Sequence, residues 1–295
     1  MKKVFKIGLI VFFTGLILGI VGWFAGGGMS TVNKLYISDH LKLNVSNEKR
    51  SVNEQISKFD NIKNNADNYA LRVVSGDKYS IKVDSNGEKL PKYKVKNGTL
   101  TIDKRETDGG RFFVHNDNAP LIIVTVPKSK TLNKVIMNVP NENQMNNFRA
   151  RNVKINQANI QLNDGNIYLE NTILNKKSKL STLDGDVKIE SSSFLNGGTI
   201  KTPSDLIYDT GKVKGELNID NKDIDDDYSD YDDYDDLNKQ TIKNVGKVNF
   251  DLKASKHGNN YVNGEKRKRD LTINSKQKNS IILNNRYGNN HITTK

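Results

Sequence analysis

Two stretches of the sequence repeat each other at an offset of twenty residues: NDGNIYLENT at 163–172 and LDGDVKIESS at 183–192. The matching positions are the Asp-Gly pairs 164–165 and 184–185, Ile167 with Val187, Leu169 with Ile189, and Glu170 with Glu190. A fixed period near twenty, with a short alternating strand and an Asp-Gly corner in each unit, is typical of stacked coils of strands. The sequence therefore predicts an all-β fold, a single-stranded β-solenoid or β-helix-like stack.

Stacking is what lets such short strands fold, because one rung has too few apolar residues to bury a face alone. A looser third copy is TGKVKGELN, in which Gly211 lies 26 residues past Gly185. We therefore expect Ile167 over Val187 over Val213, in rungs about 4.8 Å apart. A meandering antiparallel sandwich gives similar alternation, but it does not readily explain matching corners at one offset.

Further strands are expected on the N-terminal side of the repeat. YKVKNGTLTIDKRE turns at Asn97-Gly98, a strong hairpin signal. LIIVTVP, from Leu121, has the form of a buried strand. Earlier, LYISDHLKLNV is a plausible strand, whereas the segment from Ser51 to Phe59 has capping-box form and helical spacing.

The first thirty residues predict a membrane anchor. Three lysines precede IGLIVFFTGLILGIVGWF, which runs uncharged from Ile7 to Phe24. Eighteen residues rise about 27 Å as a helix, enough to cross most of a bilayer's hydrocarbon core. The lysines then stay cytoplasmic. We expect a single-pass protein of the cell membrane with its C-terminal domain outside the cytoplasm. A cleaved signal peptide is the alternative.

The same segment contains Gly15 and Gly19 in GxxxG spacing. This spacing pairs membrane helices, so a homodimer through the anchor is one interpretation. The other is that glycine is simply common in spanning helices. The predicted parts of the chain are the anchor at 1–29, a connector at 30–68, the β-solenoid at 69–219, an acidic loop at 220–240, and C-terminal strands with a basic tail at 241–295.

Several segments of the chain together resemble a known protein family. KFDNIKNNADNYALRVVSGDKYSIKV, NGTLTIDK, LIIVTVPKSKTLNKVIMNV and the repeated pair resemble, in this order, a bacterial domain of unknown function often labelled "putative adhesin". The resemblance covers roughly Lys58 to Asn218. It implies a coiled β-structure carried outside the membrane of Gram-positive bacteria, sometimes linked to envelope-stress systems, and no established enzyme activity. MNVPNENQMNNF departs from the pattern, because a Gly-marked corner is expected there.

An acidic run, DIDDDYSDYDDYDD, occupies Asp223 to Asp236. From Asp220 to Asp236 there are ten Asp and one Lys, a net charge of −9. Because the whole chain has a formal net charge of +12, the remaining residues together carry +21. Solvated loop is the first expectation for such a run. Three functional interpretations compete with it: diffuse calcium binding, docking to a basic partner, and attraction to the KRKR run. The candidate calcium ligands are Asp225, Asp227, Asp230 and Asp232, and the candidate docking residues are Tyr228, Tyr231 and Tyr234.

The basic excess is spread along the chain, and its one tight run is Lys266, Arg267, Lys268 and Arg269. Outside the membrane, the expected partners are anionic wall polymers or head groups rather than nucleic acid. Alternation along stacked strands would place lysines in rows, which suits a polyanion. General solubility in a negatively charged wall is the plainer interpretation.

No catalytic constellation is apparent in the sequence. The chain has no cysteine, and its four histidines are far apart and lack metal-ligand spacing. We therefore expect no enzyme activity and no cofactor. The predicted function is a non-catalytic, membrane-anchored cell-envelope protein, an adhesin that binds wall polymer or a surface partner. The alternative is an accessory or regulatory protein of an envelope-stress signalling system, in contact with a membrane sensor.

Overall fold

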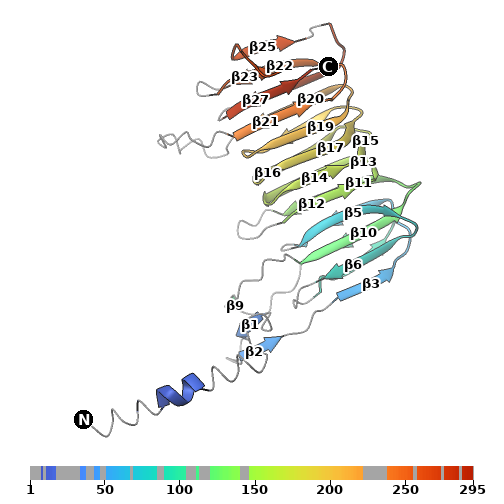
Figure 1. The fold of residues 1–295 in the computed structure, drawn as a ribbon. Coiled ribbons are helices and arrows are strands. Elements are labelled where there is room, and N and C mark those ends of the chain that lie inside the picture. The colour runs from blue at the N-terminus through green and yellow to red at the C-terminus, as the bar shows by residue number, and fades with distance from the viewer. Residues whose placement is uncertain are drawn as a thin grey trace. The chain divides into compact units, whose positions relative to one another are not determined.

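The computed structural model describes part of the chain in detail. The described residues are 8, 11–17, 34–37, 43–46, 51–66, 69–84, 90–103, 111–112, 120–139, 146–221, 238–254, 258–273, 276–285 and 288–294. The chain divides into two compact units. The larger unit holds residues 52–84, 90–105 and 119–295 and is a coil of short strands (Figure 1).

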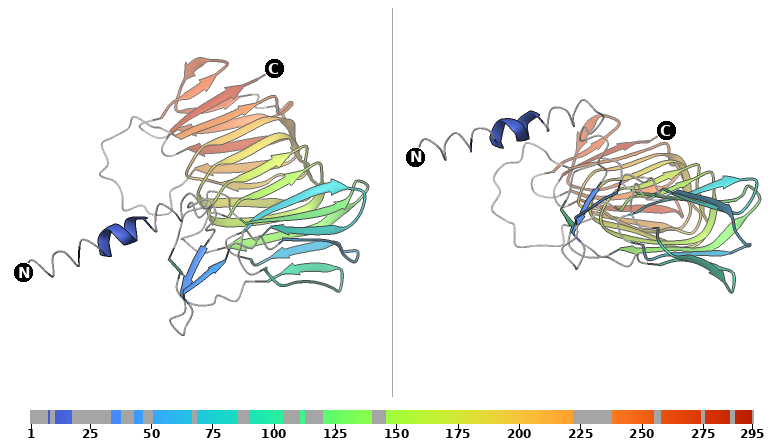
Figure 2. Two further views of the ribbon diagram at one scale, coloured as in Figure 1. Left: turned by 60° about the horizontal axis from the view of Figure 1, so that its bottom comes forward. Right: turned by 90° about the horizontal axis from the view of Figure 1, so that it is seen from below.

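Two broad faces, named A and B here, form the coil. Face A consists, in stacking order, of β7 (Tyr93–Lys96), β8 (Thr99–Ile102), β4 (Asn61–Asn64), β11 (Thr131–Val139), β13 (Lys154–Asp164), β16 (Ser178–Asp184), β18 (Gly198–Lys201), β20 (Glu216–Asn221), β26 (Ser280–Asn285), β22 (Asn249–Ala254) and β25 (Asp270–Ile273). Face B consists of β3 (Ser51–Gln55), β6 (Ser80–Asp84), β10 (Leu121–Pro127), β5 (Ala70–Gly76), β12 (Phe148–Arg151), β14 (Ile167–Glu170), β17 (Val187–Phe194), β19 (Leu206–Val213), β21 (Asn238–Lys243), β27 (Gly288–Thr293), β23 (Asn260–Val262) and β24 (Glu265–Arg267). Viewed from below, the rungs superimpose as a flattened loop (Figure 2).

A narrow face, C, closes the middle rungs. It contains β15 (Ile173–Leu174) and the adjoining ends of β11, β13, β17 and β19, which pair in parallel. Its buried side chains form one column, which consists of Leu132, Ile155, Leu174, Phe194 and Val213. Each regular turn of the coil therefore takes one strand from face A, one from face B and a short piece of face C.

The predicted stacking of the repeated pair is confirmed. Strands β14 and β17 are parallel neighbours, with Ile167 beside Val187 and Leu169 beside Ile189, and all four side chains are buried. The predicted third layer is wrong, because the residue beside Val187 in the next rung is Leu206. Val213 lies beside Phe194 on face C instead. The rung after β17 has the sequence TPSD at its corner, so the Asp-Gly marker that defines the earlier corners is missing.

Glycine at the Asp-Gly corner is required by how closely the rungs approach each other. Gly185 has φ +134°, and a Cβ there would collide with the backbone carbonyl of Gly165 in the rung below. Gly165 in turn has φ +135° and would collide with the backbone of Asn146. Only glycine adopts this conformation without strain and leaves the space free.

At both ends of the coil, strands insert between others that are not their neighbours in sequence, two or three strands inward from the edge. At the N-terminal end, β4 lies between β8 and β11, and β5 lies between β10 and β12. At the C-terminal end, β26 lies between β20 and β22, and β27 lies between β21 and β23. The antiparallel hairpin strands β7 and β24 and the antiparallel strand β25 then pair outside them. The Asn97-Gly98 turn predicted from sequence joins β7 to β8, with both residues at positive φ.

The segment expected to form a short helix is a strand. Residues Ser51–Gln55 form β3, and its side chains are exposed except Val52, which is half-buried. The helical spacing of Val52, Ile56 and Phe59 arises because Phe59 and, partly, Ile56 join the core from a loop. Tertiary packing has therefore overridden the local pattern.

The smaller unit holds residues 1–51, 85–89 and 106–118. Its described strands are β1 (Lys34–Ile37), β2 (Leu43–Ser46) and β9 (Arg111–Phe112), which form a three-stranded antiparallel sheet. The predicted strand LYISDHLKLNV is therefore an antiparallel pair of strands.

The predicted membrane anchor is not supported. Within the described part of the chain, no helix has the length and apolar character needed to cross a membrane. The prediction of a single-pass membrane protein, with the N-terminus cytoplasmic and the C-terminal domain outside, is therefore wrong for this structure. Gly15 has no neighbouring atom within 4 Å of its position for a Cβ, and Gly19 lies outside the described residues.

Candidate binding surface on face A

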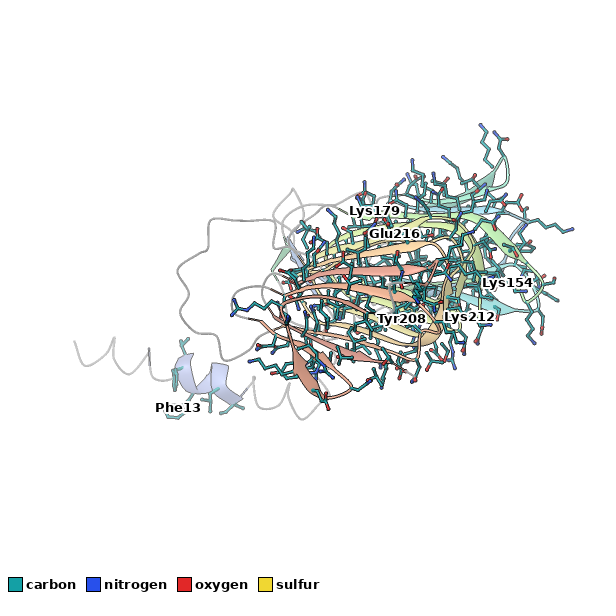
Figure 3. All side chains as sticks on the ribbon, turned by 90° about the horizontal axis from the view of Figure 1, so that it is seen from above. Phe13, Lys154, Lys179, Tyr208, Lys212 and Glu216 are labelled. Carbon is teal, nitrogen blue, oxygen red and sulfur yellow. The ribbon has the colours of Figure 1, made fainter. Side chains whose placement is uncertain are left out.

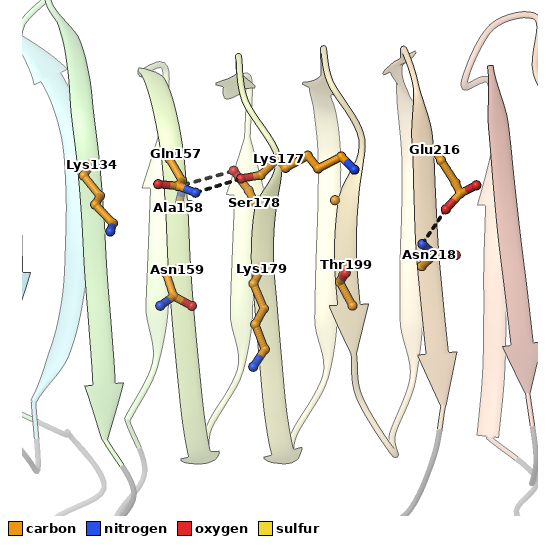
Figure 4. Close-up of a pocket in the computed structure, with 11 residues that line it drawn as sticks. Lys134, Gln157, Ala158, Asn159, Lys177, Ser178, Lys179, Thr199, Glu216 and Asn218 are labelled. Atoms are coloured by element: carbon orange, nitrogen blue, oxygen red, sulfur yellow. Dashed lines mark hydrogen bonds between the residues drawn. The ribbon is translucent and has the colours of Figure 1, made fainter. Parts of the chain in front are cut away.

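Face A carries a shallow groove lined with lysines (Figure 4). Its volume is about 340 Å³, and its cations are Lys134 of β11, Lys177 just before β16, and Lys179 within β16. The other side chains that line it are mainly amides and hydroxyls, which are Gln157, Asn159, Ser178, Thr199 and Asn218. We call this surface the lysine groove.

The register of the strands explains why these side chains meet. Along each strand, residues alternate between the core and the solvent, so positions two apart share the outer surface. Lys134 lies beside Gln157, and Lys179 lies between Asn159 and Thr199 in neighbouring rungs. The inward neighbours of Lys179 are Ser178 and Leu180, both buried. Lys134 and Lys179, which are 45 residues apart in sequence, therefore lie only two rungs apart.

The groove is electrostatically uncompensated. Within the described residues, no ion pair involves Lys134, Lys177 or Lys179, and all three are exposed. One carboxylate, Glu216, lines the groove, and its Oε1 accepts a hydrogen bond of 2.9 Å from Asn218 Nδ2. Gln157 Nε2 donates to the backbone oxygen of Lys177 at 3.3 Å, which fixes the chain beside that lysine. The groove therefore presents three cations and one anion that is already hydrogen-bonded.

The middle rungs of face B, β12, β14 and β17, have cations too, but there they are paired with carboxylates. Arg149 Nη2 lies 2.8 Å from Glu170 Oε2, and Arg151 Nε lies 3.1 Å from the other oxygen of that carboxylate. Hydrogen bonding from Arg149 holds the pKa of Glu170 below its ordinary value, despite partial burial. Lys188 pairs with Glu190 at 2.9 Å. Two carboxylates thus offset three cations in these rungs, so the middle of face B attracts an anionic ligand less than the lysine groove, where one carboxylate stands against three cations.

Narrow face C has lysines on its outer side as well. Lys154 and Lys212 stand on this side of the coil, away from Lys179 and Glu216 on face A (Figure 3). Tyr208 lies inside, where burial raises the pKa of its phenol, and its hydroxyl donates to the backbone oxygen of Ser192 at 3.0 Å. Lysines therefore occur on the outer side of face C as well as on face A.

The predicted basic run lies at the far end of face B. Lys266 and Arg267 belong to the edge strand β24, and Lys268 and Arg269 follow it. All four are exposed. The buried side chain of Asn260 donates from Nδ2 to the backbone oxygens of Lys268 at 2.8 Å and Arg269 at 2.6 Å, which fixes this turn. The run is thus a fixed and accessible cationic edge, although Arg267 forms an ion pair with Glu265.

The predicted acidic candidates lie outside the described residues. These are the calcium candidates Asp225, Asp227, Asp230 and Asp232 and the docking candidates Tyr228, Tyr231 and Tyr234. The described residues on either side are Asn221 of β20 and Asn238 of β21, whose side-chain amides donate to the backbone oxygens of Ser204 and Pro203. The acidic run is therefore inserted at a corner between faces A and B.

The stacked corner carboxylates provide no obvious chemistry. Asp164 lies beside Asp184, as the repeat predicted, and burial together with the Asp184 charge raises the pKa of Asp164. Among the residues that the structure describes, no three His, Cys, Asp or Glu side chains come together as metal ligands would. Sequence reasoning expected rows of lysines but did not single out Lys134, Lys177 or Lys179, because only the register across rungs brings them together.

A known family of sequences matches more than half of the chain, including the repeated stretches. The sequence model described as Toastrack DUF4097 matches residues 59–240. No curated protein matches the chain.

Several solved structures are similar in outline. A putative cell adhesion protein from Clostridium sporogenes is 14% identical, with 84% of this chain and 100% of that chain covered and a TM-score of 0.40. A putative adhesin from Bacteroides fragilis is 13% identical, with 83% and 96% covered and a TM-score of 0.35. A putative lipid binding protein from Parabacteroides distasonis is 16% identical, with 82% and 96% covered and a TM-score of 0.37. At these values the similarity carries no argument about function.

Proposed function

The chain belongs to the Toastrack DUF4097 family, and from this premise we propose that it is a non-catalytic binding scaffold of the cell envelope. Its ligand is an anionic polymer, held in the lysine groove of face A. The observation that supports this proposal is the contrast between the groove, where three lysines lack ion-pair partners among the described residues, and the middle rungs β12, β14 and β17 of face B, where carboxylates pair with the cations.

The geometry suits a polymer better than a small compound. The groove crosses strands β11, β13, β16, β18 and β20, so it runs along the axis of the coil. Rungs that repeat every 4.8 Å or so present donors at regular intervals to a chain lying across them. Lysine ammonium groups contribute charge, and the amides of Gln157, Asn159 and Asn218 contribute hydrogen bonds. An extended polyanion such as a phosphodiester-linked wall polymer fits this pattern.

Binding without catalysis is part of the proposal. A hydrolytic site needs a nucleophile or a water-activating base beside the bound substrate. The groove's lining contains lysines, amides, hydroxyls and Glu216, which is hydrogen-bonded to Asn218. Neither hydroxyl that lines it, Ser178 or Thr199, comes with a histidine in the lining. These residues can hold an anion, and no pair among them is arranged to activate water.

The test compares two variants of equal charge. In the groove variant, Lys134, Lys177 and Lys179 are replaced by Gln; in the control, the exposed Lys82, Lys214 and Lys253 are replaced by Gln. Binding to purified glycerol-phosphate teichoic acid is measured over a series of salt concentrations, with uncharged dextran as the reference polymer. We expect the groove variant to lose about 10-fold in affinity, or about 1.4 kcal/mol, and the control less than 2-fold. Equal losses in both variants would show that only net charge matters and would reject the groove.

A second candidate function is favoured by the position of the acidic run. This run is inserted at a corner whose two sides are fixed by Asn221 and Asn238, so the coil can serve as a rigid mount for an acidic loop. In this alternative the protein is an accessory component of an envelope-stress signalling system. Deletion of Asp223–Asp236 should then abolish crosslinking to a basic partner protein while leaving teichoic acid binding unchanged.

A further inference from the structure

A second cavity lies where narrow face C stops. Its volume is about 490 Å³, and it is lined by the end of β19, by the turn after β21, and by residues near β22 and β27. It shares no lining residue with the lysine groove. Cavities of this size hold small organic ligands in other proteins.

A local change in backbone creates the cavity. In the rungs below, face C continues as a strand through Val213, but after β21 the chain turns at Asn244 and Gly246, which have φ of +58° and +84°. Val245 and Val248 still fill the interior, with 3% and 1% exposure. A Cβ added at Gly246 would meet no atom within 4 Å, so the space beside the turn is open. The shortened rung therefore leaves a hollow above Lys212.

The chemistry of the lining is amphipathic and cationic. Lys212 and Lys247 provide two charges, and neither has an ion pair within the described part of the chain. Asn244, Gln277 and Thr294 provide amide and hydroxyl groups, and the ring of Phe250, which is 2% exposed, lies at the base. The lining contains no aspartate or glutamate. An anion is thus attracted without a competing carboxylate in the wall.

The nearest acidic group is already engaged. Asn244 Nδ2 donates to Asp209 Oδ1 at 3.3 Å, and Lys243 Nζ lies 3.0 Å from Asp209 Oδ2. Burial alone would raise the pKa of Asp209, but these hydrogen bonds and the Lys243 charge hold it below its ordinary value. The Asp209 carboxylate is therefore paired with Lys243 and forms no ion pair with Lys212 or Lys247.

Hydrogen bonds hold the walls in place before any ligand arrives. Asn249 and Gln277 are joined by two hydrogen bonds. Asn249 Nδ2 donates to the backbone oxygen of Gln277 at 2.6 Å, and the backbone nitrogen of Gln277 donates to Asn249 Oδ1 at 3.0 Å. Asn263 Nδ2 donates to Thr294 Oγ1 at 3.0 Å, and the Gly211 nitrogen donates to the Asn244 oxygen at 3.2 Å. A preformed wall reduces the entropy lost on binding.

We propose that this cavity binds a monosaccharide that carries one phosphate or carboxylate group. The ammonium groups of Lys212 and Lys247 hold the anionic group, the amides and hydroxyls hold the sugar hydroxyls, and the apolar base of Phe250 and Val245 contacts the ring's C–H edge. The cavity shares no lining residue with the lysine groove, and its proposed ligand differs from the polymer on face A, so the two sites can be tested separately.

The test uses glucose 6-phosphate as the probe, with glucose and inorganic phosphate as separate controls. Binding to the full chain is followed by calorimetry and by amide chemical shifts. We expect glucose 6-phosphate to bind at least about 5-fold more tightly than either control. Inorganic phosphate binding as tightly as glucose 6-phosphate would remove the sugar from the proposal, and no binding at about 10 mM would overturn it.

Three variants separate this site from the groove. Lys212→Gln with Lys247→Gln should reduce the affinity for glucose 6-phosphate by about 10-fold, and Lys247→Arg should retain most of it because the charge stays. Lys179→Gln, in the groove, should leave it unchanged. Both pocket lysines are exposed, so the melting curves should match that of the unmodified chain. Equal weakening by Lys179→Gln would show that the probe senses overall charge, which overturns the site.

Discussion

The middle of the coil and its C-terminal end have the same parallel strand pairing, but one column of their interiors differs. Along face B, the buried positions beneath the middle rungs are Phe148, Ile167, Val187 and Leu206. In the next three rungs the same column continues as Gln240, Asn290 and Asn260, all fully buried. The backbone ladder alone therefore does not require an apolar column.

Asn290 and Asn260 are tolerated because they bond to each other, whereas Gln240 donates from Nε2 to the backbone oxygen of Ser204 at 2.9 Å and its Oε1 has no partner among the described residues. Asn290 Nδ2 donates to Asn260 Oδ1 at 2.8 Å, and Asn285 Nδ2 donates to Asn290 Oδ1 at 3.0 Å. Asn260 in turn holds the backbone of the basic run. A buried amide is costly only when it lacks a partner, so a connected group replaces dispersion with hydrogen bonds.

The difference between the two regions has a structural use. The aliphatic middle is an interchangeable stack in which any rung resembles the next, as in other repeat proteins. The polar end is specific, because each amide needs one partner at one position. Specific pairing fixes where β26 and β27 insert and where the cationic edge at Lys266–Arg269 is displayed. The coil thus combines a repetitive support with one defined terminus.

The largest effect is expected at the Asp-Gly corner of the middle region. Gly185→Ala places a Cβ against the Gly165 carbonyl at a φ that side chains resist, so strain and overlap together should cost at least about 4 kcal/mol. Urea unfolding followed by circular dichroism measures the loss. Gly264→Ala is the control, because its φ is +84° but its surroundings are open. If both variants unfold at the same urea concentration, close approach of the rungs does not limit stability.

A smaller loss is expected from emptying the aliphatic column. Ile189 is fully buried between Leu169 and Tyr208, so Ile189→Ala should cost about 3 kcal/mol through lost contacts and a cavity. Hydrogen exchange should show the loss concentrated in the neighbouring rungs, because each rung contacts mainly its neighbours. A uniform loss of protection along the whole coil would show that the stack unfolds as one unit.

At the polar end, the free energy of unfolding should depend on the hydrogen bonds between the buried amides. Asn290→Ala removes the partner of Asn260 Oδ1 and of Asn285 Nδ2, which should cost about 2 kcal/mol. Protection of the Lys266–Arg269 turn should fall as well, since Asn260 anchors its backbone. Asn218→Ala on the outer surface is the matched control and should cost little. An unchanged stability for Asn290→Ala would mean that the amide network is dispensable.

The middle region was largely predictable and the ends were not. The Asp-Gly corners and the Ile167–Val187 and Leu169–Ile189 contacts follow from local repeats that each rung needs for its own turn and core. Gly211 was misleading because a glycine within β19 resembles a corner in sequence; its Cβ position would collide with the Ser192 carbonyl on face C. The insertion of β4 and β26 between distant strands leaves no local signal, because it depends on pairings between residues far apart in sequence.

The binding surfaces show the same limit. Lys134 and Lys179 share a groove because of the register between β11, β13 and β16, and nothing in either segment marks it. The basic run at Lys266–Arg269 was visible because its charges are consecutive. A site assembled across rungs can be found only once the rung boundaries are known.

The smallest expected effect is a pH dependence at the polar end, where His291 stacks on Tyr261 with ring centroids 4.8 Å apart. Burial and the charge of Lys239 lower the pKa of His291 below the ordinary value of 6.5. Between that lowered pKa and 6.5 the unfolded chain binds more protons, so stability should rise with pH across this window and stay flat above it. Unfolding midpoints measured from pH 5 to pH 8 test this slope, and His291→Gln should remove part of it. An NMR titration that places the pKa of His291 at or above 6.5 would contradict the argument, because the ring would then gain a proton on folding and stabilise the polar end in acid.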